Sequence, residues 1–164
     1  MKVRGANPDD LPAISEIYDH EVLHSTATFD TEGMTADERG LWLSSRNESR
    51  HPVLVCESED VIVGWGELKP WSSRKAYDRT AEVSVYVHHQ HRRQGVGRLL
   101  LSELITHAQG VGIGVLVARI SLAEGPASVG LHRSLGFEEV GVMHEVGEKF
   151  GRLLDIALLQ RPLR

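Results

Sequence analysis

A glycine-rich segment is the first part of this chain whose residue types suggest chemistry. Residues 92–98 are Arg-Arg-Gln-Gly-Val-Gly-Arg, between an apolar run that ends at Val87 and a helical pattern that starts at Val96. Paired glycines let the backbone turn sharply, and a helix N-terminus presents free N–H groups to an anion. From these residues alone the segment is either a diphosphate site or an ordinary helix start with solvated arginines. Arg92, Arg93 and Arg98 supply local positive charge for such an anion, and the residues expected to bind it are Arg93, Gln94, Gly95, Val96, Gly97 and Arg98.

A metal site is a second possibility, because His88, His89 and His91 lie close together in the sequence. Consecutive strand residues point to opposite faces, so His88 and His89 are poorly placed to hold one ion. No matching Asp, Cys or distant His pair is evident, and we expect no bound metal. The single cysteine, Cys56, excludes an internal disulfide, and we expect it to be buried in a strand.

Composition narrows the class of protein. The chain has 164 residues, and 18 Lys plus Arg against 23 Asp plus Glu give a formal charge of −5, which argues against a general nucleic-acid binder. Residues 1–8 have no apolar run typical of a signal peptide, and no stretch is long and apolar enough for a membrane span. We expect one cytoplasmic domain over residues 1–164, with no nucleic-acid or membrane partner.

The elements that must position the glycine segment alternate in type along the chain. A strand at 3–6 precedes a helix capped at Asn7, and a second helix is capped at Thr35 and continues to about Arg50. The loop between these helices, residues 25–31, has no helical period. Further elements are predicted as strands at 53–57, 61–68, 81–87, 115–120, 137–143 and 153–159, and as helices from 96 to about 110 and from 126 to 135. This order predicts an α+β fold in which one mixed, mostly antiparallel sheet has helices on both faces.

A second motif strengthens the interpretation of the glycine segment. Residues 127–137, Ala-Ser-Val-Gly-Leu-His-Arg-Ser-Leu-Gly-Phe, follow a strand and form the pattern A-S-x-x-L-x-x-x-L-G-F. Together with R-x-x-G-x-G, this order resembles the Gcn5-related N-acetyltransferase (GNAT) family. Residues 76–87 and 146–155 resemble its phosphinothricin and methionine sulfoximine acetyltransferase branch.

The resemblance implies acetyl-CoA as the co-substrate. It implies that Val85, Tyr86 and Val87 pair with the pantetheine arm and that the backbone of residues 93–98 holds the diphosphate. Family members carry an Asn that contacts the cofactor three residues before the Ser of the second motif. Gly125 stands there, with Glu124 beside it, so we expect that side-chain contact to be missing.

Two residues are candidates for the proton transfers that amine acetylation needs. Glu82 begins the cofactor strand, where desolvation favours the uncharged acid and suits a general base; the alternative is an exposed carboxylate at a strand edge. A backbone N–H at or near Val85 is the oxyanion donor that the resemblance implies. His132 occupies the position of the family's general acid, and a structural histidine is the equal alternative.

The resemblance also indicates an acceptor pocket built from Phe29, Arg74 and Tyr77. Arg74 could hold a carboxylate or phosphinate through charge-assisted hydrogen bonds, and an exposed loop cation is the alternative. Trp65 and Trp71 are either pocket walls or core.

We therefore predict transfer of an acetyl group to the amino group of phosphinothricin, methionine sulfoximine or methionine sulfone. Acetylation of peptide N-termini or polyamines, and a non-catalytic acyl-CoA-binding regulator, are the alternatives. A homodimer is implied by the resemblance alone.

Overall fold

The computed structural model describes residues 1–164, and it contains one seven-stranded sheet with the order β1-β2-β3-β4-β5-β7-β6. The strands are β1 (Lys2–Gly5), β2 (Val53–Ser58), β3 (Val61–Pro70), β4 (Thr80–Val87), β5 (Val115–Ser121), β6 (Glu138–Lys149) and β7 (Arg152–Pro162). The helices are α1 (Leu11–His24), α2 (Ala36–Ser44), α3 (Val96–Gly110) and α4 (Ala127–Ser134). Every neighbouring pair is antiparallel except β4 and β5, which run parallel, so the predicted mixed and mostly antiparallel sheet is confirmed.

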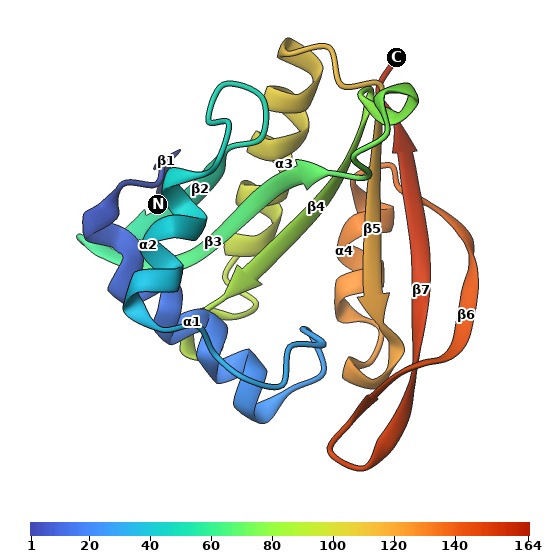
Figure 1. The fold of residues 1–164 in the computed structure, drawn as a ribbon, viewed down its shortest axis with the longest axis horizontal. Coiled ribbons are helices and arrows are strands. Elements are labelled where there is room, and N and C mark those ends of the chain that lie inside the picture. The colour runs from blue at the N-terminus through green and yellow to red at the C-terminus, as the bar shows by residue number, and fades with distance from the viewer.

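The helices cover both faces of this sheet, as the sequence predicts. On one face, Ile14 and Ile17 of α1 pack with Trp65 of β3. On the other, Leu101 and Leu104 of α3 pack with β-strand residues and with Val129 of α4. Figure 1 shows α1 and α2 on one side of the strands and α3 behind them.

Both predicted caps are present: Thr35 caps α2 directly, and Asn7 caps a 3-10 turn (Pro8–Asp10) that leads into α1. Asn7 and Thr35 accept backbone N–H groups two or three residues ahead, and Asp10 and Glu38 bond back to the cap backbone. The second helix is shorter than predicted: it ends at Ser44 and not near Arg50. Hydroxyl groups of the last turn bond to the helix carbonyls there, which satisfies acceptors that a further turn would have used.

The two closing strands are longer than predicted. They form a hairpin in which β6 continues to Lys149 through register shifts, with Glu145 at φ 54°. Residues 144–149, His-Glu-Val-Gly-Glu-Lys, are mostly polar and lack a strand pattern, whereas their backbone pairing with β7 continues from Gly147–Leu154 to Lys149–Arg152.

The geometry that matters most for a ligand is the separation of β4 from β5. These strands pair only at Thr80–Val115, Ala81–Leu116 and Glu82–Val117. Beyond Glu82 they diverge, as Figure 1 shows, and the β5-facing edge of residues 83–87 has no strand partner. No helix of the structure is long and apolar enough to cross a membrane.

Candidate active site

A cavity of about 80 Å³ lies in the opening between β4 and β5. Its walls come from both diverging strands and from α4. The lining residues are Ala27, Val83, Ser84, Val85, Tyr86, Ala118, Arg119, Ile120, Ser121, Glu124, Ser128 and His132. The opening therefore brings two of the three predicted pantetheine residues, Val85 and Tyr86, together with His132. Because the unpaired edge of β4 presents backbone N–H and C=O groups, an extended amide-containing chain can pair with it as a strand would.

The predicted diphosphate loop lies where β4 leads into α3. Arg93 and Gly95 both have positive φ, at 62° and 87°, which curves the backbone into a turn that glycine adopts without steric cost. The first N–H groups of α3 have no intrahelical acceptor, as in any α-helix, and the N-cap residue Gly95 has no side chain that could accept from them. Such a turn has the backbone geometry that a diphosphate needs.

Contacts beneath this loop keep α3 close to α4. A Cβ at Gly97 would lie 3.2 Å from the Leu131 side chain, and the Arg98 guanidinium donates to Ser134 Oγ at 2.7 Å. Val96 is buried at 2% exposure and packs into the core beneath the turn. The residues predicted for the diphosphate thus form one continuous turn, with Arg93 and Gln94 exposed on it.

Glu82 lies at the closed end of the opening, and it is buried at 6% exposure. Its carboxylate accepts two hydrogen bonds from Arg119, at 2.9 Å from Nε and 2.7 Å from Nη2, and Lys69 Nζ lies 3.7 Å away. Arg119 also lies over the Trp71 ring at 5.9 Å, and its ion pair with Glu82 raises the pKa of the guanidinium. The burial of Glu82 in the sheet agrees with the prediction. The surroundings are not purely apolar as expected, because Arg119 and Lys69 lie beside the carboxylate.

His132 is buried at 5% exposure on α4. Its Nδ1–H donates to the Ser128 carbonyl at 2.8 Å, which leaves Nε2 as the acceptor nitrogen of a neutral ring. Desolvation lowers the pKa of His132, with the Ser128 hydrogen bond opposing that shift, and the ring packs edge-on against Phe137 at 5.0 Å. The neutral ring is therefore the form that its surroundings favour.

The three predicted acceptor residues do not form one cluster within a single chain. Phe29 lies on the α1–α2 loop, in which Thr26 Oγ1 hydrogen-bonds Ser121 Oγ, at the last residue of β5. Arg74 and Tyr77 lie on the β3–β4 connection, which ends at Thr80 opposite Val115, the first residue of β5. The strand between these two ends is about 20 Å long at about 3.3 Å per residue. Arg74 and Tyr77 are exposed, as is Phe29.

Gly125 and Glu124, at the place of the missing Asn, have a different arrangement. Gly125 has φ 80°, and the Glu124 carboxylate accepts from the Thr26 backbone N–H at 2.5 Å and from Thr26 Oγ1 at 2.7 Å. The Glu124 side chain therefore connects the β5–α4 turn to the α1–α2 loop.

Several residues of this region were not singled out from the sequence. Arg119 is the only charged residue of β5, in an otherwise apolar strand, and this interruption was a usable signal. Glu21 lies seven residues after Ile14 and four after Ile17, on the buried face of α1. An acid at that spacing was the signal for a buried carboxylate.

The remaining candidates from the sequence are also placed. Trp65 is core, at 2% exposure between Tyr18 and Tyr86, whereas Trp71 is only partly buried beside Arg119. Cys56 is a free, buried cysteine, as predicted. The His88 and His89 rings stack at 4.5 Å, so the expectation that they point to opposite faces of a strand is wrong: β4 ends at Val87, and a short 3-10 helix (His89–His91) follows His88. No group of three His, Cys, Asp or Glu residues is arranged to hold a metal ion.

This combination of a diverging parallel strand pair and a glycine turn at the N-terminus of α3 agrees with the comparison with known protein families. The model of the acetyltransferase (GNAT) family matches residues 14–137. The chain belongs to the GNAT family. It is an acetyl-CoA-dependent N-acetyltransferase.

Individual relatives cover almost the whole of this GNAT chain. The L-methionine sulfoximine/L-methionine sulfone acetyltransferase of Salmonella typhimurium is 42% identical over 163 residues, 99% of this chain and 95% of that protein. The phosphinothricin N-acetyltransferase of Streptomyces viridochromogenes is 37% identical over 163 residues, 98% of this chain and 87% of that protein. The solved structure of yncA from Salmonella typhimurium with acetyl-CoA has a TM-score of 0.95 and 41% identity, and covers 100% of this chain and 94% of that one.

Proposed function

We propose that this N-acetyltransferase acetylates the amino group of a small amino-acid analogue such as phosphinothricin, methionine sulfoximine or methionine sulfone. The observation that carries the proposal is the β4–β5 opening, which leads from the glycine turn at one end to the Glu82–Arg119 pair at the other. The names of the relatives at 37% and 42% identity support the choice of acceptor.

We assign acetyl-CoA to this opening by residue. The free edge of Val85, Tyr86 and Val87 pairs with the pantetheine amides, and the backbone of residues 93–98 binds the diphosphate. Bound there, acetyl-CoA supplies the acetyl group as a thioester at the Glu82 end of the opening. The exposed β4 edge and the uncapped start of α3 support this orientation.

In the proposed reaction, Glu82 accepts the proton that the acceptor amine loses as its nitrogen bonds to the acetyl carbon. Arg119 fixes the carboxylate with two hydrogen bonds, so one orientation is set before the acceptor arrives. The Val85 N–H donates to the developing oxyanion. His132 is the proposed proton donor to the leaving thiolate. Only the doubly protonated ring can donate in this way, and burial lowers the pKa of His132 and so reduces the population of that form.

Arg74 and Tyr77 remain the proposed acceptor residues near the start of β5, with Arg74 holding the carboxylate or phosphinate by charge-assisted hydrogen bonds. Phe29 lies near the other end of β5 in the same chain, so we propose that it joins them in one pocket only across the interface between two copies. The exposed Arg74, for which the structure shows no ion-pair partner, is free for this use.

We further propose that the working enzyme is a homodimer of the cytoplasm. Apolar side chains gather on the β6–β7 hairpin, where a second copy would bury them: Val140, Val142, Met143, Val146, Phe150 and Leu153 are all at least 36% exposed. The unpaired Cys56 suits a reducing compartment.

Thiol release tests the acceptor. The enzyme is incubated with acetyl-CoA and each of the three analogues, with a peptide and a polyamine as comparison amines and with a reaction that lacks amine as background. We expect amine-dependent release with at least one analogue. Faster thiol release with the peptide or the polyamine would show that the acceptor is a peptide N-terminus or a polyamine and not an amino-acid analogue. Acetyl-CoA binding without any amine-dependent release would favour the non-catalytic regulator.

A further inference from the structure

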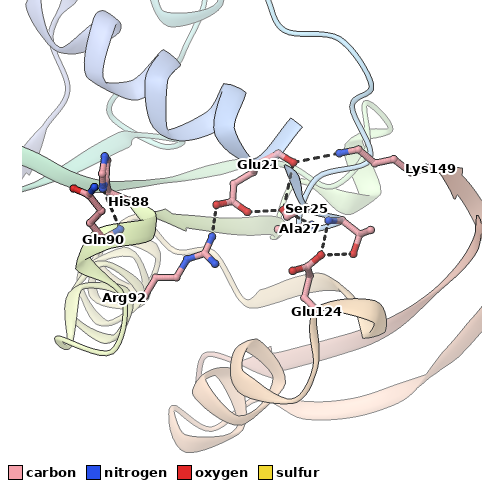
Figure 2. Close-up of polar contacts among 9 residues, drawn as sticks. Glu21, Ser25, Ala27, His88, Gln90, Arg92, Glu124 and Lys149 are labelled. Atoms are coloured by element: carbon pink, nitrogen blue, oxygen red, sulfur yellow. Dashed lines mark hydrogen bonds and ion pairs between the residues drawn. The ribbon is translucent and has the colours of Figure 1, made fainter. Parts of the chain in front are cut away.

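Glu21 is a buried carboxylate that the proposed chemistry does not use. It lies on α1 at 2% exposure, and both of its oxygens have partners. One pairs with the Arg92 guanidinium, and the other accepts from Ser25 Oγ at 2.5 Å. Figure 2 shows Glu21 between Arg92 on one side and Ser25 on the other.

Arg92 joins this carboxylate to the cofactor side of the molecule. It directly precedes the diphosphate turn, and its side chain is 48% exposed while that of Glu21 is 3% exposed. An arginine that moved onto a diphosphate would leave the Glu21 charge buried without a partner, which is costly. Arg92 therefore serves better as the partner of Glu21 than as a ligand of acetyl-CoA.

The other contacts of Glu21 lead to the α1–α2 loop. The Ser25 hydroxyl that donates to Glu21 accepts the Ala27 N–H at 3.1 Å, so it shapes the first turn of that loop. The Glu21 backbone carbonyl accepts from Lys149 Nζ at 3.3 Å, and the same ammonium donates to the Thr28 carbonyl at 2.8 Å. Lys149 is 4% exposed, and desolvation lowers its pKa.

The next residue of this loop, Phe29, fits closely against the β6–β7 hairpin. A Cβ at Gly147 would lie 2.3 Å from the Phe29 ring, so the ring occupies the space that a side chain would need. From the opposite side, Glu124 holds Thr26. The segment 25–29 is thus fixed by α1, by the hairpin and by the β5–α4 turn, and Figure 2 shows Glu21, Glu124 and Lys149 around it.

We infer that Glu21 is a positioning residue that sets the acceptor-side segment 25–29 relative to the acetyl-CoA turn, with Arg92 as its fixed partner and not as a diphosphate ligand. The acceptor part of this inference rests on the proposed function, since it takes Phe29 as a wall of the acceptor pocket. The assignment of Arg92 as the partner of Glu21, and not as a diphosphate ligand, does not depend on the proposed function.

The variants that test it are E21Q, R92Q and the double variant E21Q/R92Q. The control is R133Q, which removes an arginine from an exposed pair with Glu139. Acetyl-CoA affinity is measured by calorimetry without amine, and acceptor KM is measured at saturating acetyl-CoA. We expect E21Q and R92Q to raise the acceptor KM by about ten- to hundredfold through misplacement of the loop. We expect acetyl-CoA affinity in both, and all values in R133Q, to change by less than about threefold.

Backbone hydrogen exchange of residues 26–29, measured without any amine, gives a readout that does not depend on the acceptor. E21Q should speed exchange in this segment, and R133Q should not. If a single variant is too unstable, the double variant keeps the test open, because removal of both charges leaves no lone buried charge. It should restore the melting temperature while the acceptor KM stays high.

Two results would overturn the inference. A loss of acetyl-CoA affinity of about tenfold or more in R92Q, with E21Q unchanged, would make Arg92 a diphosphate ligand. Unchanged exchange of residues 26–29 in a folded E21Q protein would remove the positioning role. If wild-type enzyme acetylates no amino acid, the proposed acceptor fails, while the affinity and exchange measurements still decide the roles of Arg92 and Glu21.

Discussion

At the scale of single residues, two carboxylates of this enzyme are alike in burial and in pairing. Glu82 and Glu21 are both nearly inaccessible, and each is bound by an arginine from a distant part of the chain. Arg119, the partner of Glu82, lines the cavity between β4 and β5, whereas Glu21 lies under the α1–α2 loop. Burial alone therefore does not select Glu82 as the proposed base; its arginine partner, which lines the cavity, supports that choice.

Replacement of Glu82 tests that assignment. We expect E82Q to lower kcat by about 10²–10⁴-fold, since the amide keeps the size of the side chain but cannot accept the proton. R119K should also lower kcat, because lysine keeps the charge but not the two-pronged hydrogen bond. Steady-state kinetics measures both effects, and acetyl-CoA affinity from calorimetry should stay close to wild type.

The matched control is E139Q, an exposed carboxylate paired with Arg133. Wild-type kcat in E82Q would show that another group removes the proton.

Histidines whose pKa falls on folding make folding stability depend on pH. Desolvation lowers the pKa of His132, and also of His51 and His20, so the unfolded chain binds protons more readily than the folded protein. The free energy of unfolding should therefore fall as the pH drops below about 6.5, the usual histidine value, and level off below the lowered folded values.

Urea unfolding between pH 7.5 and pH 5 measures this loss, and H132Q should make it smaller. An identical pH dependence in wild type and H132Q would show that His132 is not among the responsible groups.

At the scale of elements, close packing of α3 on β3 depends on a glycine in the strand. A Cβ at Gly66 would lie 2.8 Å from the Ser84 carbonyl oxygen and 2.9 Å from Leu104 Cδ1. The backbone atom cannot yield easily, so we expect G66A to reduce the free energy of unfolding by about 1–3 kcal/mol.

The control for this variant is G5A on β1, where an added Cβ meets no atom within 4 Å. Urea midpoints compare the two proteins. A G66A midpoint no lower than that of G5A would contradict the packing argument.

At the scale of the whole molecule, the β6–β7 hairpin is where a second copy is expected to bind. Val142, exposed at 36%, lies within its apolar surface, so V142K should convert a dimer to a monomer by placing a charge in the interface. Light scattering coupled to gel filtration measures the mass. V61K, at an exposed valine on β3, is the control and should remain dimeric. A wild-type protein that is monomeric would refute the proposed dimer.

Features governed by neighbouring residues were predictable from the sequence. The caps at Asn7 and Thr35, the glycine turn before α3 and the alternation of apolar residues in β4 depend on contacts or dihedral angles within a few positions. Their residue types indicated a mixed sheet with helices, a glycine turn suited to an anion, and Glu82 on the strand before that turn. The GNAT fold and acetyl-CoA were expected from the resemblance of the two motifs to that family.

Tertiary structure decided which side chains meet. Arg119 lies 37 residues from Glu82, and Arg92 lies 71 residues from Glu21. These pairs depend on the parallel register of β4 with β5 and on the packing of α1 beside the diphosphate turn, and residue periodicity encodes neither. The sequence by itself therefore determined the glycine turn and the strand that we propose for acetyl-CoA. Only the fold determined that Glu82 is held by Arg119 and that Glu21 ties the α1–α2 loop to that turn, because such contacts require elements distant in the chain to come within hydrogen-bond distance.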